Sequence, residues 1–143
     1  AIASLALGNR LYDGSVLSEA AQRRVVRWAV LKQEQGFHGR AHKQDDSCYA
    51  FWIGATLEML DAHRLIGQKE LRDFLYSVQY VPLGGFCKLA ENGSHPDVLH
   101  TYFSLAALSL LHEPGVPLVH APLNTTRRAN EWILRCRSNW AKR

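Results

Sequence analysis

The chain has 143 residues, of which 47% are hydrophobic and 21% charged, and its formal net charge at pH 7 is +4. That length suits one globular domain, and no apolar run reaches the roughly 18 residues that a membrane span needs. The basic residues are scattered and form no stripe interleaved with aromatic ones, which disfavours nucleic-acid binding. The 3 cysteines stand at irregular spacing, which makes a poor disulfide framework and indicates a reducing compartment such as the cytoplasm.

Apolar residues recur at helical spacing along nearly the whole chain, and no segment alternates long enough to predict a strand. The chain opens on residues 1–7, which read like the inside of a helix. A second helix is expected between Ser18, a good N-cap residue, and Gly36, a good stop. Further helices are expected over residues 48–60, 68–80 and 99–111, and residues 132–140 outline a last one. The sequence therefore predicts an all-α fold.

A repeat organises these helices. Residues 2–5, 54–57 and 105–108 resemble one another at a spacing of about 50 residues. A Gly-Phe turn precedes two of them, at residues 36–37 and 85–86. Paired helices at this period indicate hairpins stacked into a solenoid or a closed toroid. Because about two and a half units are few for a free-standing array, we expect the chain to be part of a longer protein.

A possible metal site lies where loops enter two of these helices. Asp46 and Cys48 stand two residues apart at one helix start, and His100 stands at the equivalent place one repeat later. If the hairpins stack side by side, these oxygen, sulfur and nitrogen donors converge, as three protein ligands do in a catalytic zinc site. The helix N-terminus would also favour a thiolate at Cys48. Asp45 could replace Asp46 in this set, and His95 could replace His100.

Each of these residues also has an ordinary structural explanation. Asp46 would suit a helix N-cap, Cys48 a small buried position and His100 the interior of the fold. Arg40 and Lys43, just upstream, would suit a diphosphate beside a metal, although a solvated loop explains them equally well. Aromatic residues at the two helix starts would line a cavity for a long apolar ligand or belong to the core. They are Tyr49, Phe51, Trp52, Tyr102 and Phe103.

A longer motif contains these residues and is similar to one in a known family. It reads Gly39-Arg40-x-x-Lys43-x-x-Asp46-x-Cys48-Tyr49-x-Phe51-Trp52. This motif resembles the β subunits of protein prenyltransferases, and the resemblance covers nearly the whole chain. It implies that residues 1–143 form the C-terminal part of an α/α toroid built of helical hairpins.

The resemblance also implies a role for individual residues. Zinc ligands are expected at Asp46, Cys48 and His100, with Asp97 behind His100 as a helix cap or an outer partner. The residues expected to hold an isoprenoid diphosphate or to line its lipid cavity are Arg40, Lys43, Tyr49, Trp52 and Phe103.

Two positions favour the geranylgeranyl type I enzyme over the farnesyl enzyme. Lys88 follows the turn at residues 84–86, where the farnesyl enzyme has an Asp that binds magnesium. A fixed cation would replace that charge, so Lys88 and Tyr49 are the expected catalytic residues and magnesium is not expected to be required. Leu99, where the farnesyl enzyme has Tyr, is the expected peptide-binding residue. The stretch from Lys88 to His100 is slightly longer than the family pattern, which loosens the alignment of Lys88.

The implied function is zinc-dependent transfer of a geranylgeranyl group from its diphosphate to the cysteine of a Leu-ending C-terminal CaaX motif. The β subunit would act with an α subunit, on CaaX proteins such as small GTPases, and we expect the chain alone to be inactive. The alternatives are a farnesyl or Rab-type β subunit, a terpenoid cyclase of similar build, and a helical-repeat scaffold that binds proteins without chemistry.

Overall fold

A computed structural model gives the structure of the chain and describes residues 1–91 and 93–140. Its elements are α1 (Ile2–Leu7), α2 (Glu19–Val30), α3 (Ser47–Met59), the 3-10 turn η1 (His63–Leu65), α4 (Gln68–Ser77), α5 (Val98–Leu110), β1 (Val119–His120), β2 (Thr125–Thr126) and α6 (Arg127–Trp140). The expected helices are all present. The two short strands pair antiparallel, and at two residues each they are too short for an alternating pattern to reveal them.

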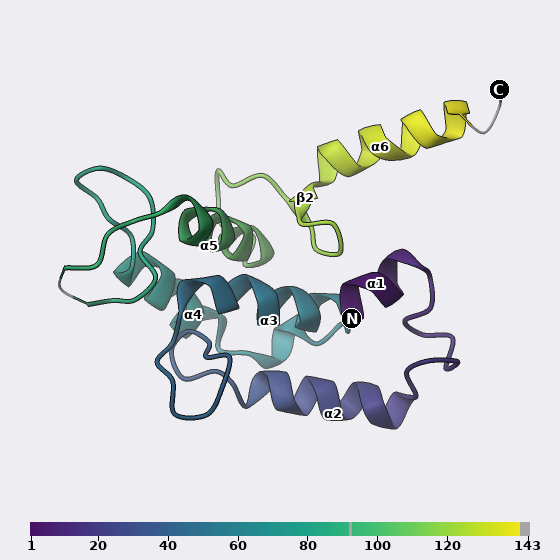
Figure 1. Ribbon diagram of the computed structural model, residues 1–143, viewed down its shortest axis with the longest axis horizontal. Coiled ribbons are helices and arrows are strands. Elements are labelled where there is room, and N and C mark those ends of the chain that lie inside the picture. The colour runs from purple at the N-terminus through teal and green to yellow at the C-terminus, as the bar shows by residue number, and fades with distance from the viewer. Residues whose placement is uncertain (92, 141–143) are drawn as a thin grey trace.

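The helices whose sequences repeat are neighbours in space. α3 lies against both α1 and α5, while α2 packs on α3, and α4 packs on α3 and α5. Figure 1 shows α3 between α2 and α5, with α6 reaching away from this group. This arrangement is a row of helical hairpins, as the repeat predicted. It brings the starts of α3 and α5 together, which is the condition for a shared site.

Burial explains which helices lie inside. α3 buries residues around most of its surface, whereas α4 buries one stripe, made of Leu71, Phe74 and Leu75. A helix that is apolar on most sides belongs between layers, and one with a single apolar stripe belongs outside. Gly54 of α3 faces α5, where a Cβ would lie in ordinary contact with the Leu110 side chain at 3.5 Å.

Equivalent turns lead into the two inner helices. Gln33 bridges to Phe37 before α3, and Gln79 bridges to Phe86 before α5. The glycines before these phenylalanines are needed. A Cβ on Gly36 would lie 2.4 Å from the Phe74 ring, and Gly85 has φ +89°. The two buried phenylalanines fix both turns on the core.

Some helix ends differ from the predicted ones. Ser18 caps α2 as expected, because its side chain accepts from the Ala21 N–H, but α2 ends at Val30. α4 ends at Ser77, since Tyr80 N instead donates to Gly85 O in the following turn. α6 begins at Arg127, earlier than the apolar pattern indicated. No helix in the described part of the chain is both long enough and apolar enough to cross a membrane.

Candidate metal centre

Three potential metal ligands meet at the starts of α3 and α5. One ligand atom from each of Asp46, Cys48 and His100 lies within 4.8 Å of the other two. Asp46 is the N-cap of α3, and its Oδ1 accepts from the Cys48 N–H at 3.0 Å. That Oδ1 also lies 3.5 Å from His100 Nε2. The predicted convergence of the three side chains is confirmed, and it follows from the lateral packing of two equivalent hairpins.

Asp97 fixes the orientation of His100. Its Oδ1 accepts from the His100 backbone N–H at 2.9 Å, and its Oδ2 lies 2.6 Å from His100 Nδ1. These bonds from His100 hold the pKa of the Asp97 carboxyl below its ordinary value. With Nδ1–H donated to Asp97, Nε2 carries the free lone pair on the side of Asp46. Asp97 is therefore both the cap of α5 and the partner of the imidazole.

The Cys48 thiol is protonated near neutral pH. Burial raises its pKa to about 12, with a further contribution from the Asp46 carboxylate beside it. A backbone hydrogen bond at the helix start lowers this pKa, as expected, but too weakly to make Cys48 a thiolate in the chain without metal. Lys88 lowers the pKa, but by less than burial and Asp46 raise it. A thiolate at this place requires a stronger positive charge, such as a divalent cation.

The two alternative ligands take no part in this group. Asp45 turns away from Asp46, and its Oδ2 accepts from the backbone N–H groups of Gln35 and Gly36. His95 does not join the cluster, which in the described residues consists of Asp46, Cys48 and His100. Asp45 and Asp46, although adjacent in the sequence, thus bind different groups.

The donor set fits zinc. Zinc accepts oxygen, sulfur and nitrogen at about 2.0–2.3 Å, and three protein ligands are typical of its catalytic sites. Donors at these radii lie about 3–4 Å apart, so side chains that now reach within 4.8 Å need only small shifts. Asp46 and the His100 side chain are largely buried, which protects such a site from bulk water.

A basic pocket adjoins Asp46, one of the three donors. It has a volume of about 280 Å³, and its lining includes Arg40, Lys43, Tyr49, Lys88 and Asp46. Lys88 Nζ lies 3.7 Å from Asp46 Oδ2. The backbone of Lys88 is fixed there because its carbonyl accepts from the Ser47 N–H at 3.0 Å. The longer stretch after Lys88, which includes Asn92 outside the described residues, does not displace it from the site.

Gly39 allows Tyr49 to face this pocket. A Cβ on Gly39 would lie 2.1 Å from the Tyr49 ring, so the ring rests directly on the glycine backbone. The sequence pattern alone did not reveal this contact. A side chain at position 39 would push Tyr49 away from Arg40 and Lys43.

The aromatic residues divide between core and surface. Phe51 is buried, whereas Trp52 is 50% exposed. Trp52 packs against Phe103 across the α3–α5 seam, with ring centroids 4.5 Å apart and the ring planes tilted by 49°. Leu99, in the first turn of α5, is also exposed. Tyr102 donates a hydrogen bond to the Asn124 carbonyl and so joins α5 to the strand pair. Trp52 and Leu99 are thus exposed apolar groups, whereas Phe103 is partly buried against the core.

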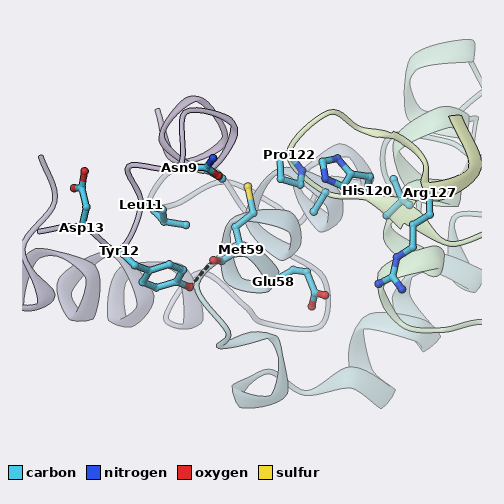
Figure 2. A pocket seen from close by; sticks show the side chains of 12 residues that line it. Asn9, Leu11, Tyr12, Asp13, Glu58, Met59, His120, Pro122 and Arg127 are labelled. Carbon is cyan, nitrogen blue, oxygen red and sulfur yellow. Dashed lines mark hydrogen bonds between the residues drawn. The ribbon is translucent and has the colours of Figure 1, made fainter. Parts of the chain in front are cut away.

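A second pocket lies at the other end of α3. It has a volume of about 590 Å³ between the loop after α1, the end of α3 and the strand pair. Figure 2 shows Glu58, Met59 and Arg127 around it, and the Tyr12 hydroxyl donating to the Met59 carbonyl. That bond measures 2.7 Å. No sequence motif pointed to this pocket, and it is separated from Cys48 by the length of α3.

Comparison with known proteins identifies the family. The family described as the prenyltransferase alpha-alpha toroid domain matches residues 1–138. The chain is 44% identical over 135 residues to the geranylgeranyl transferase type-1 subunit beta of Dictyostelium discoideum, covering 93% of this chain and 37% of that protein. It is 40% identical over 109 residues to the type-1 subunit beta of Arabidopsis thaliana, covering 68% and 28%. The chain therefore spans less than half the length of these relatives.

A further relative and a solved structure also match the chain. The chain is 31% identical over 112 residues to the geranylgeranyl transferase type-2 subunit beta of Saccharomyces cerevisiae, covering 77% of this chain and 33% of that protein. A solved structure of Candida albicans protein geranylgeranyltransferase-I complexed with GGPP matches with a TM-score of 0.75 at 24% identity, covering 91% of this chain and 40% of that chain. The predicted α/α toroid of helical hairpins is thus confirmed. This chain belongs to the prenyltransferase alpha-alpha toroid domain family.

Proposed function

We propose that residues 1–143 are the C-terminal part of the catalytic β subunit of a zinc-dependent protein geranylgeranyltransferase of type I. The observation that carries this proposal is the convergence of Asp46, Cys48 and His100 beside a basic pocket. Two relatives that are 44% and 40% identical are named type-1 beta subunits, which supports this class within the family.

The metal-binding part of the proposal assigns zinc to Asp46, Cys48 and His100. When bound, zinc supplies a Lewis acid that lowers the pKa of an acceptor thiol toward neutrality. The two anionic ligands, Asp46 and Cys48, balance its charge. Asp97 keeps the His100 proton on Nδ1, so that Nε2 remains a donor.

The diphosphate-binding part assigns the basic pocket to the leaving group. In the transfer, the acceptor sulfur forms a bond to the first prenyl carbon, the carbon–oxygen bond breaks, and its electron pair leaves on the diphosphate. Arg40, Lys43 and Lys88 stabilise that negative charge, and the Tyr49 hydroxyl donates a hydrogen bond to it. Lys88 supplies a fixed positive charge there, and for this reason we propose that magnesium is not required.

The remaining assignments concern the lipid, the acceptor and the partners. Trp52 and Phe103 would line the cavity of the geranylgeranyl chain, and Leu99 would leave room for a Leu at the acceptor's C-terminus. The acceptors are CaaX proteins such as small GTPases, and the partner is a prenyltransferase α subunit. Free thiols at Cys48, Cys87 and Cys136 support a reducing compartment such as the cytoplasm.

A transfer assay tests this proposal. A complete β subunit that contains residues 1–143, co-expressed with a prenyltransferase α subunit, is expected to geranylgeranylate a Leu-ending CaaX peptide without magnesium. Cys48→Ala is expected to remove zinc and transfer together, whereas Cys136→Ala on α6 leaves both unchanged. Transfer that survives in Cys48→Ala would contradict the metal site, and preference for a farnesyl donor would move the protein to another class of the family.

A further inference from the structure

The loop before α3 carries the two cations of the basic pocket. Arg40 and Lys43 are both exposed along their side chains, so the backbone of this loop decides where their charges lie. The loop runs from Gly36 to Asp46, and the Asp46 N–H donates to the Phe37 carbonyl at 3.0 Å. What holds the rest of the loop closed therefore matters for the pocket.

Asp45 closes the loop from inside. Its Oδ2 accepts from the Gln35 N–H at 3.0 Å and from the Gly36 N–H at 2.7 Å, so one oxygen binds the residues where the loop begins. Its other oxygen lies 3.4 Å from His38 Nδ1, and both side chains are only 11% exposed. Neither Asp45 Oδ1 nor His38 Nδ1 has a hydrogen-bond partner. The Asp45 carboxylate is thus enclosed by the loop that it closes.

The base of the loop is in turn tied to the next hairpin. Gln33 Nε2 donates to the Gly67 carbonyl at 2.8 Å, and the Gly67 N–H donates to Gln33 Oε1 at 2.9 Å. The His38 N–H donates to the Lys32 carbonyl at 3.1 Å. Because Gly67 is the N-cap of α4, the loop is fixed on the body of the fold at one end and by Asp45 at the other.

We propose that Asp45 is a positioning residue of the diphosphate pocket. It holds residues 36–45 in one conformation, so that Arg40 and Lys43 stand opposite Lys88 before the ligand arrives. Two like charges in one free loop would separate, and their ordering on binding would cost conformational entropy. Asp45 removes most of that cost. The inference rests on the proposed function, because it concerns the same pocket.

Two variants and one control test this role. Asp45→Ala removes both backbone contacts, whereas Asp45→Asn keeps one oxygen that can accept from both N–H groups. Asp73→Ala removes an exposed carboxylate on α4 and serves as the matched control. Dissociation constants for geranylgeranyl diphosphate and for geranylgeraniol are measured for each variant in the zinc-loaded complex of the complete β subunit with its α subunit, together with zinc content and thermal midpoint.

The loss of Asp45 is expected to weaken binding of the diphosphate but not of the alcohol. In Asp45→Ala, the Kd for the diphosphate rises about tenfold while the Kd for the alcohol is unchanged; Asp45→Asn and Asp73→Ala stay within about twofold of the wild type. Equal affinity of Asp45→Ala for the diphosphate would overturn the inference alone. An equal loss for both ligands, or loss of zinc, would show a merely structural residue and also overturn it. Failure of the wild type to bind the diphosphate would overturn the proposed function and the inference with it.

Discussion

At the scale of single residues, the protonation of Cys48 decides how the site responds to a metal. The thiol has a pKa of about 12, because it is buried beside the Asp46 carboxylate. A metal that binds sulfur must therefore displace a proton. Residue types at two helix starts indicated the donors but left Asp45 and His95 open, and the family resemblance favoured Asp46 and His100. It could not give the proton state, which depends on burial that only the packed hairpins create.

The displaced proton predicts a pH dependence. Between pH 7 and 9 the thiol remains protonated in the metal-free chain, so zinc affinity is expected to rise about tenfold per pH unit. Competition with a chelator of known pH dependence measures this slope. Cys136→Ala should show the same slope, whereas Cys48→Ala should bind no zinc at any of these pH values. A flat affinity in the wild type would mean that Cys48 does not bind as a thiolate.

At the scale of elements, a polar contact joins α4 to the end of α5. Arg72 Nε donates to Glu113 Oε2 at 2.7 Å, and the Tyr76 hydroxyl donates to Glu113 Oε1 at 2.9 Å. Arg72 also donates to the Leu111 carbonyl at 3.2 Å, which satisfies the C-cap of α5. These hydrogen bonds hold the pKa of the Glu113 carboxyl below its usual 4.5, and the bond from Arg72 contributes most.

This contact predicts an acid-sensitive contribution to stability. A carboxyl whose pKa is lowered in the folded state stabilises the fold above its ordinary pKa, and the contribution is lost as the pH falls through the lowered value. Glu113→Gln is therefore expected to unfold at a lower temperature than the wild type at pH 7, and this difference should vanish in acid. Glu19→Gln, at an exposed pair with Arg23, should change little. A difference that persists below the lowered pKa would contradict the assignment.

The helices themselves were largely predictable, but their ends were not. Ser18 and the repeated Gly-Phe turns gave correct signals because capping and glycine turns are local. α4 ends before Tyr80 because the Tyr80 N–H bonds to the Gly85 carbonyl across the following turn, a contact that the helical spacing of apolar residues does not reveal. The role of Asp45 was missed for the same reason, since its partners Gln35 and Gly36 lie at the far end of a loop.

At the scale of the whole molecule, the repeat predicted the architecture. A period of about 50 residues requires that equivalent helices stack, and α1, α3 and α5 are neighbours as that rule demands. Stacking then places Asp46 beside His100, although they are far apart in the sequence. The pocket near Tyr12 and Met59 could not be predicted, because it depends on how the loop after α1 and the strand pair fold over the end of α3.

One measurement tests the metal centre most directly: zinc-edge X-ray absorption on the purified, zinc-loaded chain. Our account predicts one zinc per chain with a single sulfur neighbour at about 2.3 Å and nitrogen or oxygen neighbours at about 2.0–2.2 Å. Cys48→Ala should lose the zinc itself, whereas the zinc and its sulfur shell should persist in Cys136→Ala. Zinc well below one per chain, or a zinc shell without sulfur in the wild type, would contradict the claim that Asp46, Cys48 and His100 bind one ion.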